Sequence, residues 1–293
     1  MGQRLIVRFA ALILACSFSV GRAQQPQHVT VAGRDVAVWK PTLAAPAKGY
    51  PLIVFSHGFT GCNTQTRFLM EALANAGYLV LAPNHQDAGC GRGRYVFGNG
   101  TQKPAVPFRD AGEWSDQTYR DRREDMKAVL NALLSHSEFD GVRVDGSRIG
   151  AAGHSLGGYT VLGLAGGWPS WKDPRIKAVL ALSPYSSPYL SKKQLSNLNI
   201  PVMYQGGTRD SGITPTVKKS GGAYDQSSTP KYYVELDGAG HFAWTNVNRS
   251  YVSSIDAYSV AFFDAYLKGR KDDLTKLFNG GRRKDVSDLR STE

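Results

Sequence analysis

The chain has 293 residues, of which 42% are hydrophobic and 20% are charged, and its formal net charge is +11. No break in composition divides the part after residue 23, whose length suits one α/β domain with a single core. The positive surplus favours weak association with anionic surfaces such as phospholipid or cell envelope. Because no nucleic-acid-binding motif accompanies it, nucleic acid is not an expected partner.

Residues 1–23 have the pattern of a cleavable signal peptide. Arg4 and Arg8 precede an apolar run over residues 9–20, and small residues follow at 21–23. This run is too short to span a bilayer as a mature anchor. We therefore expect a secreted or periplasmic protein whose single domain covers residues 24–293. The alternative is a lipoprotein anchored through Cys16.

The first half of the mature chain alternates strands with helices. Residues 28–40 alternate apolar and polar residues around a glycine, which predicts an opening antiparallel hairpin. The expected elements that follow are a buried strand over 51–55, a helix with its apolar face over 69–76, a strand over 78–82 and a helix over 119–136. The connection over residues 83–117 has no sustained periodicity, and we interpret it as a rim or lid above the site.

Residues 148–167 predict a strand, a sharp turn and a small-residue helix around Gly153-His154-Ser155-Leu156-Gly157. A G-x-S-x-G nucleophile elbow requires this arrangement, in which the serine hydroxyl lies at the tip of the turn. Ser155 is therefore the candidate nucleophile. The two glycines remove side chains that would collide inside the turn.

The second half predicts further buried strands over 177–183, 201–204 and 231–236, and a closing helix with its apolar face over 258–266. Strands that alternate with helices imply a mainly parallel sheet covered on both sides, with its site at the carboxyl ends of the strands. The basic residues near the C-terminus are interpreted as a solvated helix end and tail.

A serine hydroxyl needs a general base, which itself needs an orienting acid. His241 is favoured as the base because it follows the last predicted strand and completes the order Ser, Asp, His. Asp210, which follows a strand end, is its predicted partner, with Asp237 and Asp225 as weaker candidates. His85 with Asp87 is the rival pair, but it precedes the serine.

Two backbone N–H groups are predicted to bind the oxyanion. The strand over 51–55 runs into the glycine-bearing loop Ser56-His57-Gly58-Phe59-Thr60-Gly61, which can turn an N–H group towards the elbow. We nominate the N–H groups of Phe59 and Leu156. His57 is interpreted as support for this loop, and His154 as a structural residue beside the elbow.

The motifs SHGF, GHSLGG, GGTRD and GAGHF, spread over nearly all of the mature chain, resemble the α/β-hydrolase superfamily. The sequence is similar to the branch that holds dienelactone-hydrolase-like proteins, platelet-activating-factor acetylhydrolases and cutinase-like polyester hydrolases. Dienelactone hydrolases proper use a cysteine nucleophile, from which Ser155 departs. In the polyester hydrolases an aromatic residue after the next strand flanks the acyl group. The resemblance assigns this position to Tyr185, which could equally be ordinary core.

Cys62 and Cys90 remain once the leader is removed. An even count in an exported protein suggests one disulfide, and the resemblance places these cysteines after neighbouring strands, where their loops could meet. Neither cysteine has metal-ligand spacing, so no metal is expected, and we expect no cofactor.

These observations predict an exported serine hydrolase that cleaves carboxylic esters through an acyl-enzyme, with lipid-type esters or polyesters as candidate substrates. Two alternatives remain. One is an amidase or peptidase with the same three residues, and the other is a non-catalytic binding protein on a hydrolase scaffold.

Overall fold

A computed structural model describes residues 25–90, 106–136 and 138–293. The predicted signal peptide, Cys16 and part of the predicted rim lie outside the described residues. The described strands are β1 (Gln27–Val31), β2 (Arg34–Trp39), β3 (Tyr50–Ser56), β4 (Leu79–Pro83), β5 (Glu138–Phe139), β6 (Val142–His154), β7 (Ile176–Leu182), β8 (Val202–Gly207), β9 (Lys231–Leu236) and β10 (Val286–Thr292). The α-helices are α1 (Arg67–Asn75), α2 (Arg120–Leu134), α3 (Leu156–Leu162), α4 (Ser187–Leu190), α5 (Thr214–Lys218), α6 (Ala223–Gln226), α7 (Val252–Leu267) and α8 (Asp272–Phe278).

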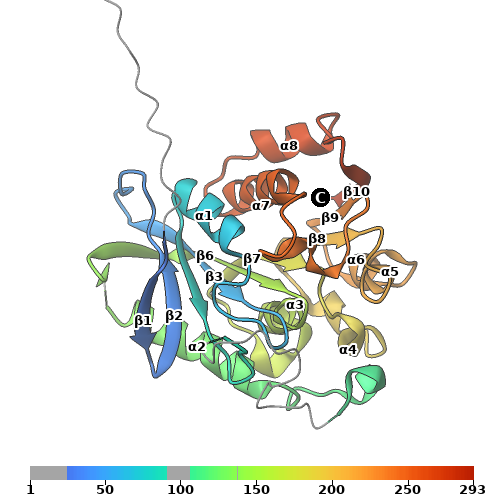
Figure 1. Ribbon diagram of the computed structural model, residues 1–293, viewed down its shortest axis with the longest axis horizontal. Coiled ribbons are helices and arrows are strands. Elements are labelled where there is room, and N and C mark those ends of the chain that lie inside the picture. Colours follow the sequence, from blue (N-terminus) through green and yellow to red (C-terminus); the bar gives the residue numbers. More distant parts are fainter. Residues whose placement is uncertain (1–24, 91–105, 137) are drawn as a thin grey trace, which may run out of the picture.

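One sheet runs through the molecule in the order β1-β2-β4-β3-β6-β7-β8-β9-β10, with β5 paired to β6 beside this path. Along the path β4-β3-β6-β7-β8-β9 neighbouring strands are parallel, whereas β1 with β2, β2 with β4, β5 with β6, and β9 with β10 are antiparallel. Figure 1 shows α1 and α7 on one side of the sheet and α2 and α3 on the other. The predicted α/β-hydrolase fold, with its N-terminal hairpin, is confirmed.

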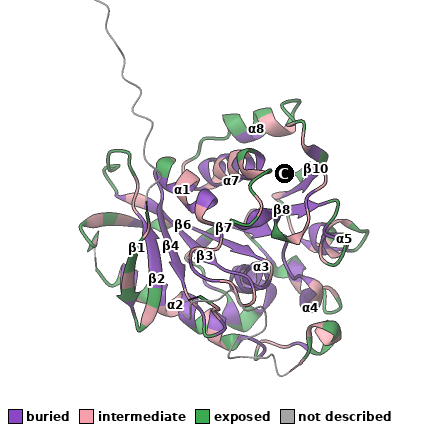
Figure 2. Ribbon diagram, viewed as in Figure 1, coloured by how far each residue is buried: buried purple, intermediate pink, exposed green. Residues whose placement is uncertain are grey.

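The central strands are buried on both faces, as Figure 2 shows. Neighbouring strand residues belong to opposite cores, because successive side chains point to opposite faces of a sheet. Val54 contributes to the core that includes α2 and α3, and Phe55 to the core that includes α1 and α7. These two cores fix the strand ends from which the candidate site residues project.

The interpretation of the C-terminal residues as a solvated tail is wrong in part. Helix α8 precedes β10, which forms an edge strand with Leu289 opposite Val234 of β9. Arg270 pairs with Asp264 at 2.6 Å, but 62% of its side chain is exposed, so for this arginine the solvated interpretation holds. An edge strand with one open side carries mixed polar residues, and the pattern Val-Ser-Asp-Leu-Arg-Ser-Thr has little apolar signal.

Among the helices of the described ranges, none has both the length and the apolar character needed to cross a bilayer.

Candidate active site

Ser155 lies at the turn between β6 and α3. Its backbone has φ +56° and ψ −116°, a region that a residue with a side chain rarely adopts. A Cβ on Gly153 would collide with the carbonyl oxygen of Gly157, and a Cβ on Gly157 would collide with that of Ser56. Glycine is therefore required at both positions for the turn to close, and the turn places Ser155 at the carboxyl end of the sheet.

The structure brings Ser155, His241 and Asp210 together. His241 begins the short helical turn η5 (His241–Trp244) after β9, and its Nε2 lies 2.9 Å from Ser155 Oγ. Its Nδ1 lies 3.2 Å from Oδ1 of Asp210, which follows β8. The side chain of Asp210 is 3% exposed and that of His241 is 27% exposed. The buried carboxylate thus faces a histidine that remains open to solvent.

Ser183, directly after β7, is a member of this group that the sequence analysis missed. Its hydroxyl donates to Asp210 Oδ2 at 2.5 Å and lies 2.8 Å from His241 Nδ1. Burial by itself raises the pKa of Asp210, but hydrogen bonds from His241 and Ser183 outweigh it and leave this pKa below its usual value. The only sequence signal was position, since Ser183 is the last residue of the predicted buried strand over 177–183.

His154 connects the backbone beneath the site. Its Nε2 donates to the His241 carbonyl oxygen at 2.9 Å, and its Nδ1 accepts from Gln65 Nε2 at 2.8 Å. The Gln65 side-chain oxygen in turn accepts from the Gly58 N–H at 3.1 Å. His154 therefore ties the histidine loop to the loop after β3, in the structural role that its position beside the elbow predicts.

A second Ser-His-Asp array lies inside the protein. Ser56 Oγ is 2.9 Å from His85 Nε2, and His85 Nδ1 is 3.0 Å from Asp125 Oδ2. Ser56 is fully buried and the His85 side chain is 0% exposed, so no substrate reaches this array. The rival pair of His85 with Asp87 does not form, because Asp87 instead pairs with Arg122 at 2.7 Å.

The loop after β3 lies against the elbow. A Cβ on Gly58 would stand 3.5 Å from Ser155 Cβ, which shows how closely this loop approaches the serine. Among the hydrogen bonds of the described residues, none uses the backbone N–H of Phe59 or of Leu156. Both nominated donors therefore lack an internal acceptor in this part of the chain, as groups reserved for an oxyanion would.

Aromatic side chains pack around Tyr185. Its backbone N–H donates to the Ser155 carbonyl at 3.0 Å, and its hydroxyl donates to the Phe108 carbonyl. The ring centroids of Phe108 and Trp114 lie 5.1 Å and 5.0 Å from that of Tyr185, and the Phe59 centroid lies 5.3 Å from that of Phe108. Phe108 and Trp114, which belong to the predicted rim, thus pack against Tyr185.

The predicted disulfide is not formed, because Cys62 and Cys90 are both free cysteines. Cys62 Sγ lies 3.5 Å from Thr64 Oγ1, and Cys90 Sγ donates to Asn84 Oδ1 at 3.7 Å. The two loops are joined by the Gly89 N–H, which donates to the Gly61 carbonyl at 2.9 Å. The prediction that the two loops meet was therefore right, whereas the covalent bond also needs oxidation, which residue spacing does not determine. Within the ranges that the structure describes, no cluster of His, Cys, Asp and Glu could hold a metal ion.

Two models of known protein families match this chain. A model described as PET hydrolase-like matches residues 113–287, the range that holds Ser155, Asp210 and His241. The chain belongs to the PET hydrolase-like family. A model of platelet-activating factor acetylhydrolase, isoform II, matches residues 26–131 of this family member.

Individual relatives agree with this assignment. Cutinase 1 of Thermobifida cellulosilytica is 28% identical over 221 residues, which cover 74% of this chain and 69% of that protein. Cutinase est1 of Thermobifida alba is 27% identical over 253 residues, or 83% of this chain and 70% of the relative. A bis(hydroxyethyl) terephthalate hydrolase of Streptomyces coelicolor is 28% identical over 217 residues, or 73% and 56% of the two chains. This PET hydrolase-like protein is a carboxylic-ester hydrolase.

Proposed function

We propose that this ester hydrolase works through Ser155 as nucleophile, His241 as general base and Asp210 as the orienting acid. The single observation that carries the proposal is the 2.9 Å contact between Ser155 Oγ and His241 Nε2, in a place that solvent reaches. The buried array around Ser56 has similar distances without access, so exposure separates the two.

In the proposed reaction, Ser155 Oγ attacks the ester carbonyl carbon while His241 Nε2 accepts the hydroxyl proton. The N–H groups of Phe59 and Leu156 bind the oxygen that becomes negative. As the tetrahedral intermediate collapses, the C–O bond to the alcohol breaks and His241 gives the proton to the leaving alcohol. Water then attacks the acyl-enzyme by the same route and releases the acid.

For the substrate, we propose polyester or lipid-type esters. Two features support this class: the partly exposed rings of Phe59 and Phe108, which pack together beside Tyr185, and the names of the relatives, which are cutinases and a terephthalate-ester hydrolase. Aromatic rings offer large apolar contact area to a flat acyl group. Contact between Tyr185 and the acyl group is part of the proposal.

The first experiment measures hydrolysis of p-nitrophenyl esters of graded chain length, together with the matching anilide and a fluorophosphonate. Ser155→Ala should fold normally, lose nearly all ester turnover and fail to take up the fluorophosphonate. Ser196→Ala, an exposed serine, is the matched control. Retention of most activity in S155A would refute the assignment. Anilide cleavage at a rate like that of the ester would favour an amidase, and no turnover at all would favour a binding protein.

The second experiment compares bis(hydroxyethyl) terephthalate and an amorphous polyester film with an acetyl phospholipid. Release of terephthalate at a higher kcat/KM than acetate supports the polyester class, and the reverse order supports the lipid class. Activity on p-nitrophenyl acetate alone would contradict both.

We also propose that the protein is exported after cleavage of residues 1–23. Intact-mass measurement on the full chain expressed in a bacterial host should give a mature protein that begins at Gln24. A lipid-modified N-terminus at Cys16 would instead establish the lipoprotein, and an uncut chain would remove the proposal.

A further inference from the structure

Three donors hold the carbonyl oxygen of Gly58. His57 Nδ1 donates at 2.7 Å, the Gly61 N–H at 3.0 Å and Arg122 Nη2 at 3.2 Å. A carbonyl oxygen has two lone pairs and in most structures accepts one or two hydrogen bonds. Three donors on one oxygen restrict the orientation of this peptide far more than the turn alone requires.

The same peptide carries the N–H of Phe59. A trans peptide is planar, and its C=O and N–H groups point in opposite directions. Donors that fix the Gly58 oxygen therefore also fix the direction of the Phe59 N–H, away from Arg122. We infer that Arg122, together with His57, is a positioning residue that aims the Phe59 N–H at the oxyanion. This inference rests on the proposed function, in which Phe59 supplies an oxyanion donor.

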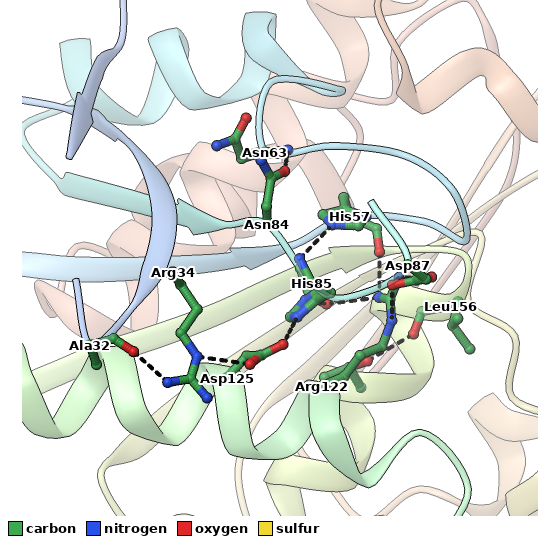
Figure 3. Close-up of polar contacts among 12 residues, drawn as sticks. Ala32, Arg34, His57, Asn63, Asn84, His85, Asp87, Arg122, Asp125 and Leu156 are labelled. Carbon is green, nitrogen blue, oxygen red and sulfur yellow. Dashed lines mark hydrogen bonds and ion pairs between the residues drawn. The ribbon is translucent and has the colours of Figure 1, made fainter. Parts of the chain in front are cut away.

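Figure 3 shows the Arg122 side chain reaching from α2 towards Asp87 and the His57 carbonyl. Its side chain is 0% exposed, like that of Asp87, and its Nε and Nη2 both bond to that carboxylate. Its Nη1 donates to the His57 carbonyl at 2.7 Å. A buried ion pair adds little net stability compared with apolar residues of similar size. The position of the pair is better explained by the hydrogen bonds of Arg122, which donates to the carbonyls of His57 and Gly58, the two residues before Phe59.

His57 is held in the one tautomer that can assist. Its Nε2 accepts from the His85 backbone N–H at 3.1 Å, so Nδ1 carries the proton that is donated to Gly58. Burial and the nearby Arg122 charge lower the pKa of His57 well below its usual value, which keeps the ring neutral. The buried array of Ser56, His85 and Asp125 anchors both the residue before His57 and the residue whose N–H binds the His57 ring.

The test uses Arg122→Lys in the full-length protein. Lysine keeps a charge for Asp87 but cannot reach the carboxylate and both carbonyls at once. We expect kcat on a p-nitrophenyl ester to fall by about 10-fold to 100-fold with KM within about 3-fold, since a misaimed donor weakens the transition state and not the ground state. The inhibition constant of an aryl trifluoromethyl ketone, whose adduct with the serine carries an oxyanion, should rise by the same factor. The affinity for the product acid should not change.

Arg148→Lys is the matched control. Arg148 also pairs with an aspartate, Asp145, at 2.7 Å and donates to a backbone carbonyl, that of Gly49, at 2.9 Å. It lies in the middle of β6, seven residues before Ser155, and neither of its partners belongs to the site, so R148K should lose stability without loss of kcat. Equal loss of kcat in both variants would show that Arg122 matters only for stability. That result would overturn the inference, as would a wild-type kcat in R122K.

If R122K does not fold, Asp87→Asn replaces it, because it loosens the arginine and leaves a neutral side chain of the same shape. D87N should lower kcat and weaken trifluoromethyl ketone binding together, and a change in neither would overturn the inference. Failure of the proposed function has a different signature, namely activity retained in S155A. An inactive S155A beside a fully active R122K would reject only the role of Arg122.

Discussion

Ser183 Oγ lies 2.8 Å from His241 Nδ1, closer than Asp210 Oδ1 at 3.2 Å. The serine also donates its proton to Asp210 Oδ2, so the three side chains form a closed ring of polar contacts. Ser183 has φ +41°, in the left-handed region, and this conformation turns its hydroxyl towards the pair. The orientation of the histidine thus depends on a serine as well as on the aspartate.

Ser183→Ala should therefore lower kcat/KM by about 10-fold, because a hydrogen bond to a charged group contributes about 1.5 kcal/mol or more. Ser183→Gly also lacks the hydroxyl but relieves the positive φ, so it should be the more stable variant and show a similar loss of activity. Steady-state kinetics and urea denaturation measure the two effects. Full activity in both variants would show that Asp210 alone orients His241.

Gly157→Ala should destabilise the protein by about 3 kcal/mol or more and reduce activity. The added Cβ would collide with the Ser56 carbonyl, so either the elbow or the end of β3 must move. Gly212→Ala is the control, since no atom lies within 4 Å of its Cβ, and it should change stability by less than about 1 kcal/mol. Equal midpoints of urea denaturation for the two variants would contradict the packing argument.

His154 should make stability depend on pH. Burial and the nearby His241 lower its pKa to about 3, whereas an unfolded histidine titrates near 6.5. Between these values the unfolded chain binds a proton that the folded protein does not bind, so stability falls as the pH falls. The slope from this group is up to about 1.4 kcal/mol per pH unit.

His154→Gln removes this titration. Its free energy of unfolding, measured by urea denaturation from pH 7 to pH 4, should depend less steeply on pH than that of the wild type. Parallel curves would mean that His154 is not the source of the dependence.

Tyr185 should act through its ring. Tyr185→Phe loses only the hydrogen bond to the Phe108 carbonyl, whereas Tyr185→Ala also loses the packing against Phe108 and Trp114. If the ring contacts the acyl group, Y185A should raise KM for bis(hydroxyethyl) terephthalate more than for p-nitrophenyl acetate, and Y185F should do so little. An equal rise for both esters would assign Tyr185 to the core.

The amino-acid sequence by itself determined the order of the central strands and of the main helices between them, and the candidate site residues near the strand ends. Strong apolar runs such as 51–55 and the G-x-S-x-G turn depend on local chemistry, because a strand buried on both faces and a strained turn each restrict the residues within them. His241 and Asp210 followed from the rule that the strands of a parallel sheet end at one edge.

The tertiary structure alone decided which side chains meet. Two contacts join segments that are far apart in the chain: the ring of Ser183, Asp210 and His241, and the pairing of Asp87 with Arg122. The free state of Cys62 was likewise not determined by the spacing of the cysteines. Strand β10 was missed because an edge strand is fixed by its partner β9 and not by its own apolar pattern. Contacts of this kind depend on the distances between elements in the folded protein. The spacing of residues along the chain does not determine these distances.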